Sequence, residues 1–339
     1  MDKIEFELGK LYNSDFLNCY SEWDSPTAII SDGPYGIGGY IGDLVTVDNL
    51  ASWYKPFLLA WYEHSLPNTT LWFWNTELGW ASVHNSIVES GWDFVNCHTW
   101  NKGISHIAGN VNSKTIRHFP KVTEVCVQYV RRNVIQSRSK EKLILKDWLR
   151  YEWKRTKLPF SRTNIACAVK NAATRKYFTK CHLWYFPPSE AFQKFVDYAN
   201  EHGDVNGKPY FSVDGINPLS GKEWEKYRAK FNYIHGFTNV WNTKPLNGSE
   251  RLKNGTKALH NNQKPLDLLS LIISASTDLG DIIWEPFGGL CSGSIAATKL
   301  GRKFFASEIN SEVFMHAADR FKNIQSEIIV QAKVRELVA

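Results

Sequence analysis

The sequence predicts an α/β protein in which one mixed sheet carries helices on both faces and a mostly helical, basic segment interrupts the sheet in mid-chain. Two observations support this fold class. Strand-like and helix-like runs alternate near both ends of the chain, whereas residues 131–240 are basic and irregular. Near the C-terminus a strand, a glycine-bearing turn, a helix and a second strand follow one another, as is typical of Rossmann-like sheets.

The N-terminal half of the sheet is expected from three short runs rich in β-branched and aromatic residues. They lie at residues 27–31, 70–74 and 122–130, and longer amphipathic stretches accompany them. The run at 27–31 has an apolar centre, which predicts a buried strand.

The C-terminal half is expected from residues 266–307. The pattern predicts an apolar helix at 266–276, a strand at 281–284, a helix at 292–300 and a strand at 302–307. Because both ends of the chain show the same alternation, residues 1–130 and 241–339 are assigned to one discontinuous domain. Residues 131–240 are then an insert in that domain.

The positive charge of the chain is concentrated in this insert. The net charge is +6, but residues 131–182 carry 15 Lys and Arg against three acids, and the remainder carries 25 basic and 31 acidic residues. A basic segment within an acidic protein favours binding to a polyanion. A solvated helical surface is the alternative interpretation.

Composition excludes several classes of protein. The 14% aromatic content is too high for a disordered chain, and 339 residues can bury a large core. No apolar run approaches ~18 residues, and residues 1–5 lack a signal-peptide pattern, so we expect a cytoplasmic protein without membrane contact. The six cysteines show no C-x-x-C spacing, so no metal site is expected.

The C-terminal pattern predicts a nucleoside-type cofactor. A strand leads into the turn at 286–289, and Glu308 follows the next strand, 19 residues after Gly289. A carboxylate at about 20 residues beyond such a turn can accept hydrogen bonds from ribose hydroxyls. The turn lacks the G-x-G-x-x-G phosphate cradle, which favours S-adenosylmethionine over a dinucleotide. A turn that only lets a helix pack on a strand is the alternative.

A second motif follows the strand at 27–31, where residues 31–36 read Ser-Asp-Gly-Pro-Tyr-Gly. Open α/β sheets bind ligands at this end of their strands. Asp32 and the Gly33 carbonyl can accept the two N–H bonds of an exocyclic amino group, and Tyr35 can stack on a planar base. An ordinary β-turn is the alternative, because Asp-Gly-Pro is favourable turn chemistry.

Together these motifs resemble those of the S-adenosylmethionine-dependent DNA amino-methyltransferases, which modify adenine N6 or cytosine N4. The family's (Asp/Asn/Ser)-Pro-Pro-(Tyr/Phe) tetrapeptide, its Asp-Pro-Phe-x-Gly turn and its Gln-Lys-Pro segment are matched by Asp32-Gly33-Pro34-Tyr35, Glu285-Pro286-Phe287-Gly288-Gly289 and Gln263-Lys264-Pro265. The order of motifs is similar to the β class of restriction–modification enzymes. The resemblance covers residues 8–130 and 255–325 and implies a methyltransferase fold in which 131–240 is the target-recognition region.

The chain departs from the family pattern at three places. Gly33 replaces the first proline, Glu285 replaces aspartate, and Leu290-Cys291 replace a Ser-Gly pair. Each departure leaves the contacts at that position to be established from the structure.

The resemblance also implies a role for each matched residue. The catalytic set is Asp32, Gly33, Pro34 and Tyr35. The residues implied to bind the cofactor are Asp15, Phe16, Lys264, Pro286, Phe287, Gly288, Gly289, Glu308 and Ile309, where Ser14-Asp15 corresponds to a Gly-Asp pair that touches the cofactor adenine in the family.

The implied reaction is methyl transfer to the amino nitrogen of a base flipped out of double-stranded DNA, without a metal or a covalent intermediate. Aspartate at the first tetrapeptide position is found more often with adenine N6, so adenine is preferred over cytosine N4. A non-catalytic DNA-binding protein on a degenerate scaffold is a further alternative. Cytosine carbon-5 chemistry would need a nucleophilic cysteine, typically after proline, and no cysteine here follows a proline. A cognate restriction endonuclease is an implied partner, and a homodimer stays open.

Two short helices that meet at a turn are expected within residues 158–181. A helix-turn-helix would direct Asn171, Thr174, Arg175 and Lys176 toward a major groove. Neighbouring cations, among them Lys154 and Arg155, are expected to meet phosphates. A small packed helical pair without base contacts is the alternative.

Overall fold

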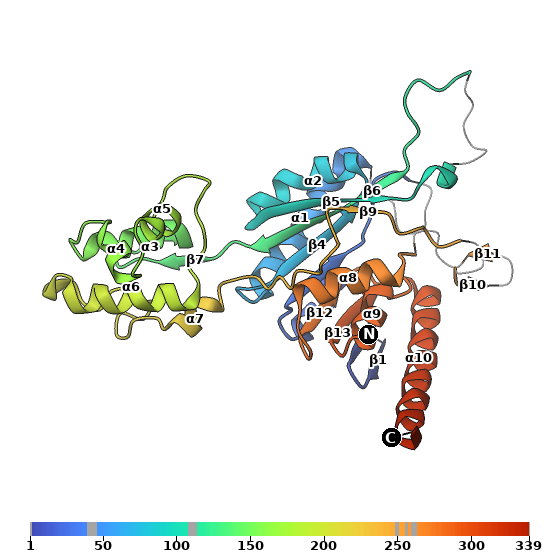
Figure 1. Ribbon diagram of the computed structural model, residues 1–339. Helices are drawn as coiled ribbons and strands as arrows, with labels where there is room; N and C mark the ends of the chain where they lie inside the picture. The colour runs from blue at the N-terminus through green and yellow to red at the C-terminus, as the bar shows by residue number, and fades with distance from the viewer. Residues whose placement is uncertain are drawn as a thin grey trace. The chain divides into compact units, whose positions relative to one another are not determined.

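The computed structural model describes residues 2–38, 46–107, 114–247, 251–254, 257–258 and 263–338, with the backbone alone for 253–254, 257–258 and 325–338. The chain forms two compact units (Figure 1). Unit 1 consists of Met1–Arg131 and Lys230–Ala339, and unit 2 consists of Arg132–Ala229.

Unit 1 is built on a nine-stranded sheet within the described residues. In spatial order the strands are β1 (Asp2–Phe6), β2 (Gly9–Asn13), β13 (Lys303–Glu308), β12 (Ile282–Glu285), β3 (Ala28–Ser31), β4 (Thr70–Asn75), β6 (Thr123–Arg131), β5 (Trp92–Asn101) and β9 (Val240–Trp241). The five strands from β2 to β4 are parallel, and β6 runs antiparallel to both of its neighbours. A short ladder, β10 (Lys253–Asn254) with β11 (Lys257–Ala258), lies outside this sheet.

The two halves of the sheet join where β12 pairs with β3, with Ile283 opposite Ala28 and Trp284 opposite Ile29. This pairing confirms the prediction that both ends of the chain form one sheet. The strands and helices expected on either side of the insert are also present, with boundaries that differ by one residue or less.

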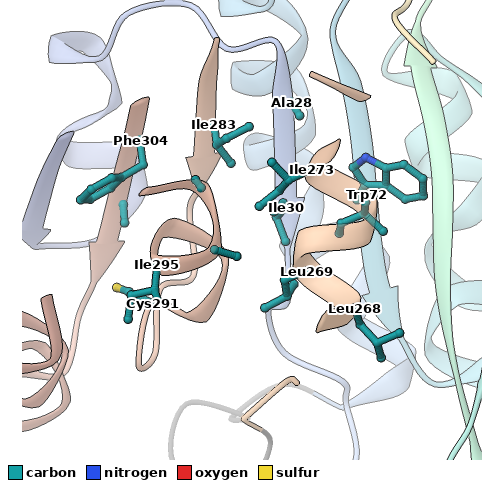
Figure 2. Close-up of a cluster of buried hydrophobic side chains, with 14 of the residues drawn as sticks. Ala28, Ile30, Trp72, Leu268, Leu269, Ile273, Ile283, Cys291, Ile295 and Phe304 are labelled. Atoms are coloured by element: carbon teal, nitrogen blue, oxygen red, sulfur yellow. The ribbon is translucent and has the colours of Figure 1, made fainter. Parts of the chain in front are cut away.

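Helices cover both faces of the sheet because side chains along the buried strands alternate between two cores. Ala28 and Ile30 of β3 pack in the core formed with α8 (Leu266–Ser276), α9 (Ser292–Lys299) and α10 (Ser311–Val338) (Figure 2). Ile29 packs in the opposite core with α1 (Val47–His64) and α2 (Glu77–Glu89). The short helices η1 (Phe16–Asn18), η2 (Tyr20–Glu22) and η3 (Ile104–Ile107) complete unit 1.

A topological switch point lies between β3 and β12. From β3 the chain passes through α1 to β4 on one side, whereas from β12 it passes through α9 to β13 on the other side. In open α/β sheets the crevice at the carboxyl ends of two such strands is the preferred ligand site. The fold therefore places the segments after Ser31 and after Glu285 at that position.

Unit 2 is mostly helical and has its own aromatic core. Its elements are β7 (Val134–Gln136), β8 (Lys142–Ile144), α3 (Leu145–Arg155), α4 (Arg162–Ala166), α5 (Ala172–Tyr177), α6 (Ser189–His202), η4 (Val205–Gly207) and α7 (Gly221–Glu225). Trp148, Trp153 and Trp224 are fully buried, and the rings of Phe192 and Trp224 stack at 4.5 Å. This core allows unit 2 to order its basic surface.

The second connection between the units begins at residue 230 rather than at the expected 241. Lys230 forms ion pairs with Asp278 and Asp281 at 2.8 and 2.7 Å, and β9 pairs with β5. Residues 230–240 thus belong to unit 1 by their contacts. Among the described residues, no helix has the length and apolar character that a membrane span requires.

Candidate active site

The polar segments singled out in the sequence meet at one edge of the sheet. Parallel strands end at the same edge, so Asn13, Ser31, Glu285 and Glu308 lie along it in adjacent strands. Because β6 runs the other way, it contributes its first residues to this edge, and Glu124 lies there too.

The Asp32–Tyr35 turn is held by side chains from two neighbouring elements. The Pro34 carbonyl accepts a hydrogen bond from the Tyr54 hydroxyl at 3.0 Å and from Asn75 Nδ2 at 3.2 Å. The Tyr35 hydroxyl donates to Asp32 Oδ1 at 2.8 Å. The carboxylate of Asp32 is therefore fixed within its own turn.

Gly33, where the family has proline, is in contact with the Phe287 ring in the turn at residues 286–289, which is called the cofactor turn below after its predicted role. A Cβ atom at Gly33 would lie 2.6 Å from both Phe287 Cδ2 and the Tyr54 hydroxyl. Phe287 in turn packs against Trp53 and Phe57 of α1. This ring occupies the space that a larger residue at position 33 would need, so the glycine brings the two turns together.

Lys264, predicted with the cofactor residues, reaches the catalytic tetrapeptide. Its ammonium lies 2.9 Å from both carboxylate oxygens of Asp32 and 3.0 Å from the Tyr35 hydroxyl, and its side chain is 3% exposed. Burial alone would lower the pKa of Lys264, but the carboxylates of Asp32 and Glu124 raise it above its ordinary value. Lys264 is therefore a buried ammonium, and its contact with the cofactor stays a prediction.

The Tyr35 side chain is buried, and its hydroxyl points into the same cluster, 3.4 Å from Glu124 Oε2. Burial, with the charges of Asp32 and Glu124, raises the pKa of Tyr35 well above its ordinary value. The phenol thus remains a proton donor. Stacking of its ring on a base stays a prediction.

Two further residues complete the cluster, and the sequence interpretation missed both. Glu124 is buried, lies 3.4 Å from Lys264 Nζ and forms an ion pair with Lys102. Burial alone would raise the pKa of Glu124, but Lys264 and Lys102 lower it. The sequence offered one signal, the acidic Glu124 at the start of an otherwise mostly apolar strand. The sequence alone does not show which residues this carboxylate contacts.

The cofactor turn is tied to the end of β13. The backbone N–H of Gly288 donates to the Ser307 carbonyl at 2.7 Å, and that of Gly289 donates to Glu308 Oε2 at 2.7 Å. Glu308 Oε1 accepts from the Asn310 N–H at 2.8 Å. The Ile309 N–H also bonds this carboxylate, so three of its four lone pairs are engaged and one is left to accept a ribose hydroxyl. Burial raises the pKa of Glu308, and Ile309 beside it is exposed.

Glu285 caps the helix that follows the turn. Its Oε1 accepts from the Gly293 N–H at 2.8 Å, and its Oε2 accepts from the Ser294 N–H at 2.7 Å. A Cβ at Gly293 would lie 2.8 Å from Oε1, which explains the glycine there. The glutamate that replaces the family aspartate therefore serves to reach the first turn of α9.

Cys291 and Arg320 complete the structure of this turn. Cys291 has a left-handed backbone (φ 53°), and its buried thiol packs in the core near Ile295. Burial raises the pKa of this thiol well above its ordinary value. Arg320 of α10, which was not expected here, donates to the Leu290 carbonyl at 2.8 Å and to Ser292 Oγ at 2.9 Å. The Leu290-Cys291 departure is thus accommodated by packing.

The segment after β2 lies beside Glu308. The Ser14 N–H donates to the Glu308 carbonyl at 3.1 Å, and Asp15 Oδ1 accepts from the Leu17 N–H at 2.8 Å. The Phe16 ring is only 1% exposed and packs on Trp23 and Trp284. The ring of Phe16 is thus part of the core, and its contact with the cofactor stays a prediction.

The donor set at this edge fits S-adenosylmethionine. Glu308 can accept a ribose hydroxyl and Ile309 offers an exposed apolar surface, whereas the turn has no glycine-rich cradle for a phosphate. Within the described ranges, no group of three or more His, Cys, Asp or Glu side chains could hold a metal ion.

Comparison with known proteins decides the family. The family model described as DNA methylase matches residues 27–319. The chain belongs to the DNA methylase family. S-adenosylmethionine is the methyl donor of these enzymes.

Individual relatives of this chain match over shorter stretches. The type II methyltransferase M2.MboI of Moraxella bovis is 27% identical over 149 residues, 44% of each chain. The DNA adenine methyltransferase YhdJ of Escherichia coli K12 is 38% identical over 80 residues, 23% of this chain and 27% of YhdJ. The chain thus covers less than half the length of either relative. The cytosine-N4-specific PvuII DNA methyltransferase shares the fold, with a TM-score of 0.51 and 13% identity over 94% of this chain and 91% of its own.

In unit 2, the two expected short helices are present as α4 and α5. Asn171, Arg175 and Lys176 are exposed. Thr174 is not directed outward as expected, because its hydroxyl lies 2.8 Å from the Thr163 hydroxyl of α4. The helical pair therefore offers three of the four predicted groove-facing side chains.

The two cations expected at phosphates differ in their surroundings. Lys154 is exposed, whereas Arg155 forms an ion pair with buried Glu152 and donates to the Gly207 carbonyl. Burial raises the pKa of Glu152, although Arg155 opposes this shift. The structure corrects the phosphate role expected for Arg155, because this guanidinium neutralises an internal carboxylate.

Proposed function

We propose that this protein transfers a methyl group from S-adenosylmethionine to the N6 amino group of adenine in double-stranded DNA. The observation that carries the proposal is the contact of Gly33 with Phe287. It sets the amine-accepting turn against the cofactor turn at the switch point of the sheet. A base held by the first turn would then face the methyl group of a cofactor held by the second.

The chain's own residues position and polarise the amine. When bound, the cofactor supplies an activated methyl group. The aryl amine is a weak nucleophile because its lone pair is delocalised into the ring. Hydrogen bonds from its N–H groups to Asp32 and to the Gly33 carbonyl favour a tetrahedral nitrogen whose lone pair points at the methyl. Most of the rate enhancement then comes from positioning.

Adenine is preferred to cytosine as the target base because an aspartate occupies the first tetrapeptide position. YhdJ, the relative with 38% identity, is named an adenine methyltransferase, and this supports the same choice. Mass spectrometry of nucleosides from DNA treated with the protein tests it. N6-methyladenine is expected, and N4-methylcytosine without N6-methyladenine would overturn the choice.

Asp32→Ala separates catalysis from binding. Transfer of labelled methyl groups to DNA should be abolished, while cofactor binding measured by calorimetry stays close to that of the wild type. Asp24→Ala, outside the site, is the control. Near-normal turnover in Asp32→Ala would disprove the role of this carboxylate. Absence of any transfer by the wild type would instead favour a non-catalytic DNA-binding protein.

Unit 2 is proposed to bind the duplex. Residues 132–229 carry 19 Lys and Arg against 10 Asp and Glu, and Lys154, Arg175 and Lys176 are exposed. A restriction endonuclease that acts on the same site is the proposed biological partner. Sequencing that detects modified bases, on DNA from cells expressing the protein, would identify the recognition site and show which endonucleases it blocks.

A further inference from the structure

The carboxylate of Asp32 is the most heavily engaged group at the site. Its Oδ1 accepts from the Tyr35 hydroxyl at 2.8 Å and from Lys264 Nζ at 2.9 Å. Its Oδ2 accepts from Lys264 at 2.9 Å. A carboxylate oxygen offers two lone pairs. Among the contacts of the described residues, Oδ1 is thus fully used, and Oδ2 keeps one lone pair for an incoming amino group.

The charges around Asp32 are balanced by the same lysine. Glu124 is bridged to Asp32 by the Tyr35 hydroxyl, which lies 2.8 Å from one carboxylate and 3.4 Å from the other. A buried carboxylate beside a second, partly buried one is destabilised unless positive charges compensate the pair. Lys264 contacts both of them, and Lys102 contacts Glu124. The cluster therefore contains two acids and two ammonium groups.

We propose that Lys264 and Glu124 are positioning residues. Lys264 places its positive charge against the Asp32 carboxylate, Glu124 helps to hold that ammonium, and together they present Asp32 Oδ2 to the amino group of the target base. This inference rests on the proposed function, because it concerns how the same carboxylate receives the amine. Glu124 gives the Lys264 ammonium a second acceptor. Lys264 can therefore shift toward Glu124 when the amino group of the base forms a hydrogen bond to Asp32. The other titratable groups that face this cluster are Tyr35, Lys102, Cys126, Glu285 and His106.

The pH dependence of methyl transfer tests the proposal. The rate of a single turnover is measured between pH 5 and 9 with labelled S-adenosylmethionine and unmethylated plasmid DNA. In Lys264→Met the carboxylates lose their shared cation, so the pH at which the rate falls on acidification should rise by about 1–3 units. Lys264→Arg keeps the charge and should keep the wild-type profile.

The double variant Lys264→Met/Glu124→Gln removes one charge of each sign. The pH at which its rate falls on acidification should return toward the wild-type value, because Asp32 no longer faces a second carboxylate. Lys230→Met is the matched control, since Lys230 also lies between two aspartates but contacts Asp278 and Asp281 far along the sequence from the tetrapeptide. If Lys264→Met does not fold, Lys264→Gln keeps a hydrogen-bond donor without the charge and carries the same test.

Three outcomes would overturn the proposal. A Lys264→Met profile that is lower in rate but unmoved in pH would reduce Lys264 to a structural residue. A loss of S-adenosylmethionine affinity that accounts for the whole loss of rate would make it a cofactor ligand. If the rate of the double variant falls at the same pH as that of Lys264→Met, a positioning role for Glu124 is excluded. Each of these outcomes requires a wild type that methylates DNA, so none is confused with failure of the proposed function.

Discussion

Ser294 donates two hydrogen bonds to Oε2 of Glu285, one from the Ser294 backbone N–H at 2.7 Å and one from the Ser294 hydroxyl at 2.6 Å. The carboxylate is buried, and it connects the end of β12 to the first turn of α9. This link sets the direction in which the helix leaves the cofactor turn. It also has consequences that can be measured as changes in stability.

Glu285→Asp is expected to destabilise the protein. The shorter side chain cannot reach Gly293 and Ser294 together, so at least one buried N–H loses its acceptor. Such a loss costs about 1–3 kcal/mol. Chemical denaturation followed by circular dichroism measures the free energy of unfolding. Unchanged stability in Glu285→Asp would show that the cap is dispensable.

The stability of the wild type should depend on the ionisation of Glu285. Burial raises the pKa of this carboxyl from 4.5 to about 7 in the folded state. Between these values the folded chain binds a proton that the unfolded chain has lost, so this contribution to stability is full at low pH and is lost as the pH rises toward 7. Relative to Glu285→Gln, the wild type should lose on the order of 2 kcal/mol from pH 5 to pH 8. Parallel curves for the two proteins would contradict the prediction.

Substitution of Gly33 should impair the site through Phe287. Gly33→Ala places a Cβ 2.6 Å from Phe287 Cδ2, so the ring must move and the two turns separate. Methyl transfer should fall by about tenfold or more, the equivalent of 1.4 kcal/mol. In Gly33→Ala/Phe287→Leu the loss should be smaller than the sum of the two single losses, because the clash with Phe287 is relieved although the close approach to the Tyr54 hydroxyl remains. Strict additivity would indicate that the contact is unimportant.

Cofactor affinity should weaken on mild acidification through Glu308. A ribose hydroxyl donates to the ionised carboxylate, and burial raises its pKa, so protonation begins at a higher pH than for an exposed glutamate. Glu308→Gln should bind S-adenosylmethionine about tenfold or more weakly at pH 8, since a hydrogen bond to a charged group contributes about 1.5–3 kcal/mol. Calorimetry from pH 8 to pH 5 should give a flatter dependence for Glu308→Gln than for the wild type.

Three cations of unit 2 should respond differently to alanine substitution. Arg175→Ala should weaken binding to the cognate duplex more than to an unrelated one, and an equal loss on both would exclude base reading. Lys154→Ala should weaken both equally and reduce the salt dependence of binding by about one phosphate contact. Arg155→Ala should instead lower the melting temperature, because it leaves the buried carboxylate of Glu152 unpaired.

The sequence by itself determined the plan of unit 1 and the position of its motifs. The strand around Ile29 and the helix at Leu266–Ser276 follow from local periodicity, and local periodicity depends only on which residues are neighbours in the chain. The 19-residue spacing from Gly289 to Glu308 likewise predicted that this acid lies beside the cofactor turn, where the Gly289 N–H donates to it. Strand β5 was not predicted, because four consecutive residues of it are exposed and break the alternation.

Only the tertiary structure decided which side chains meet. Glu124 lies near Asp32 because the strand order brings β6 to the same edge as β3, and Lys264, two residues before α8, contacts both carboxylates. Arg155 and Thr174 turn inward because unit 2 has internal groups that need partners. Such pairings depend on the packing of residues that are distant in the chain, and neither composition nor spacing carries that information.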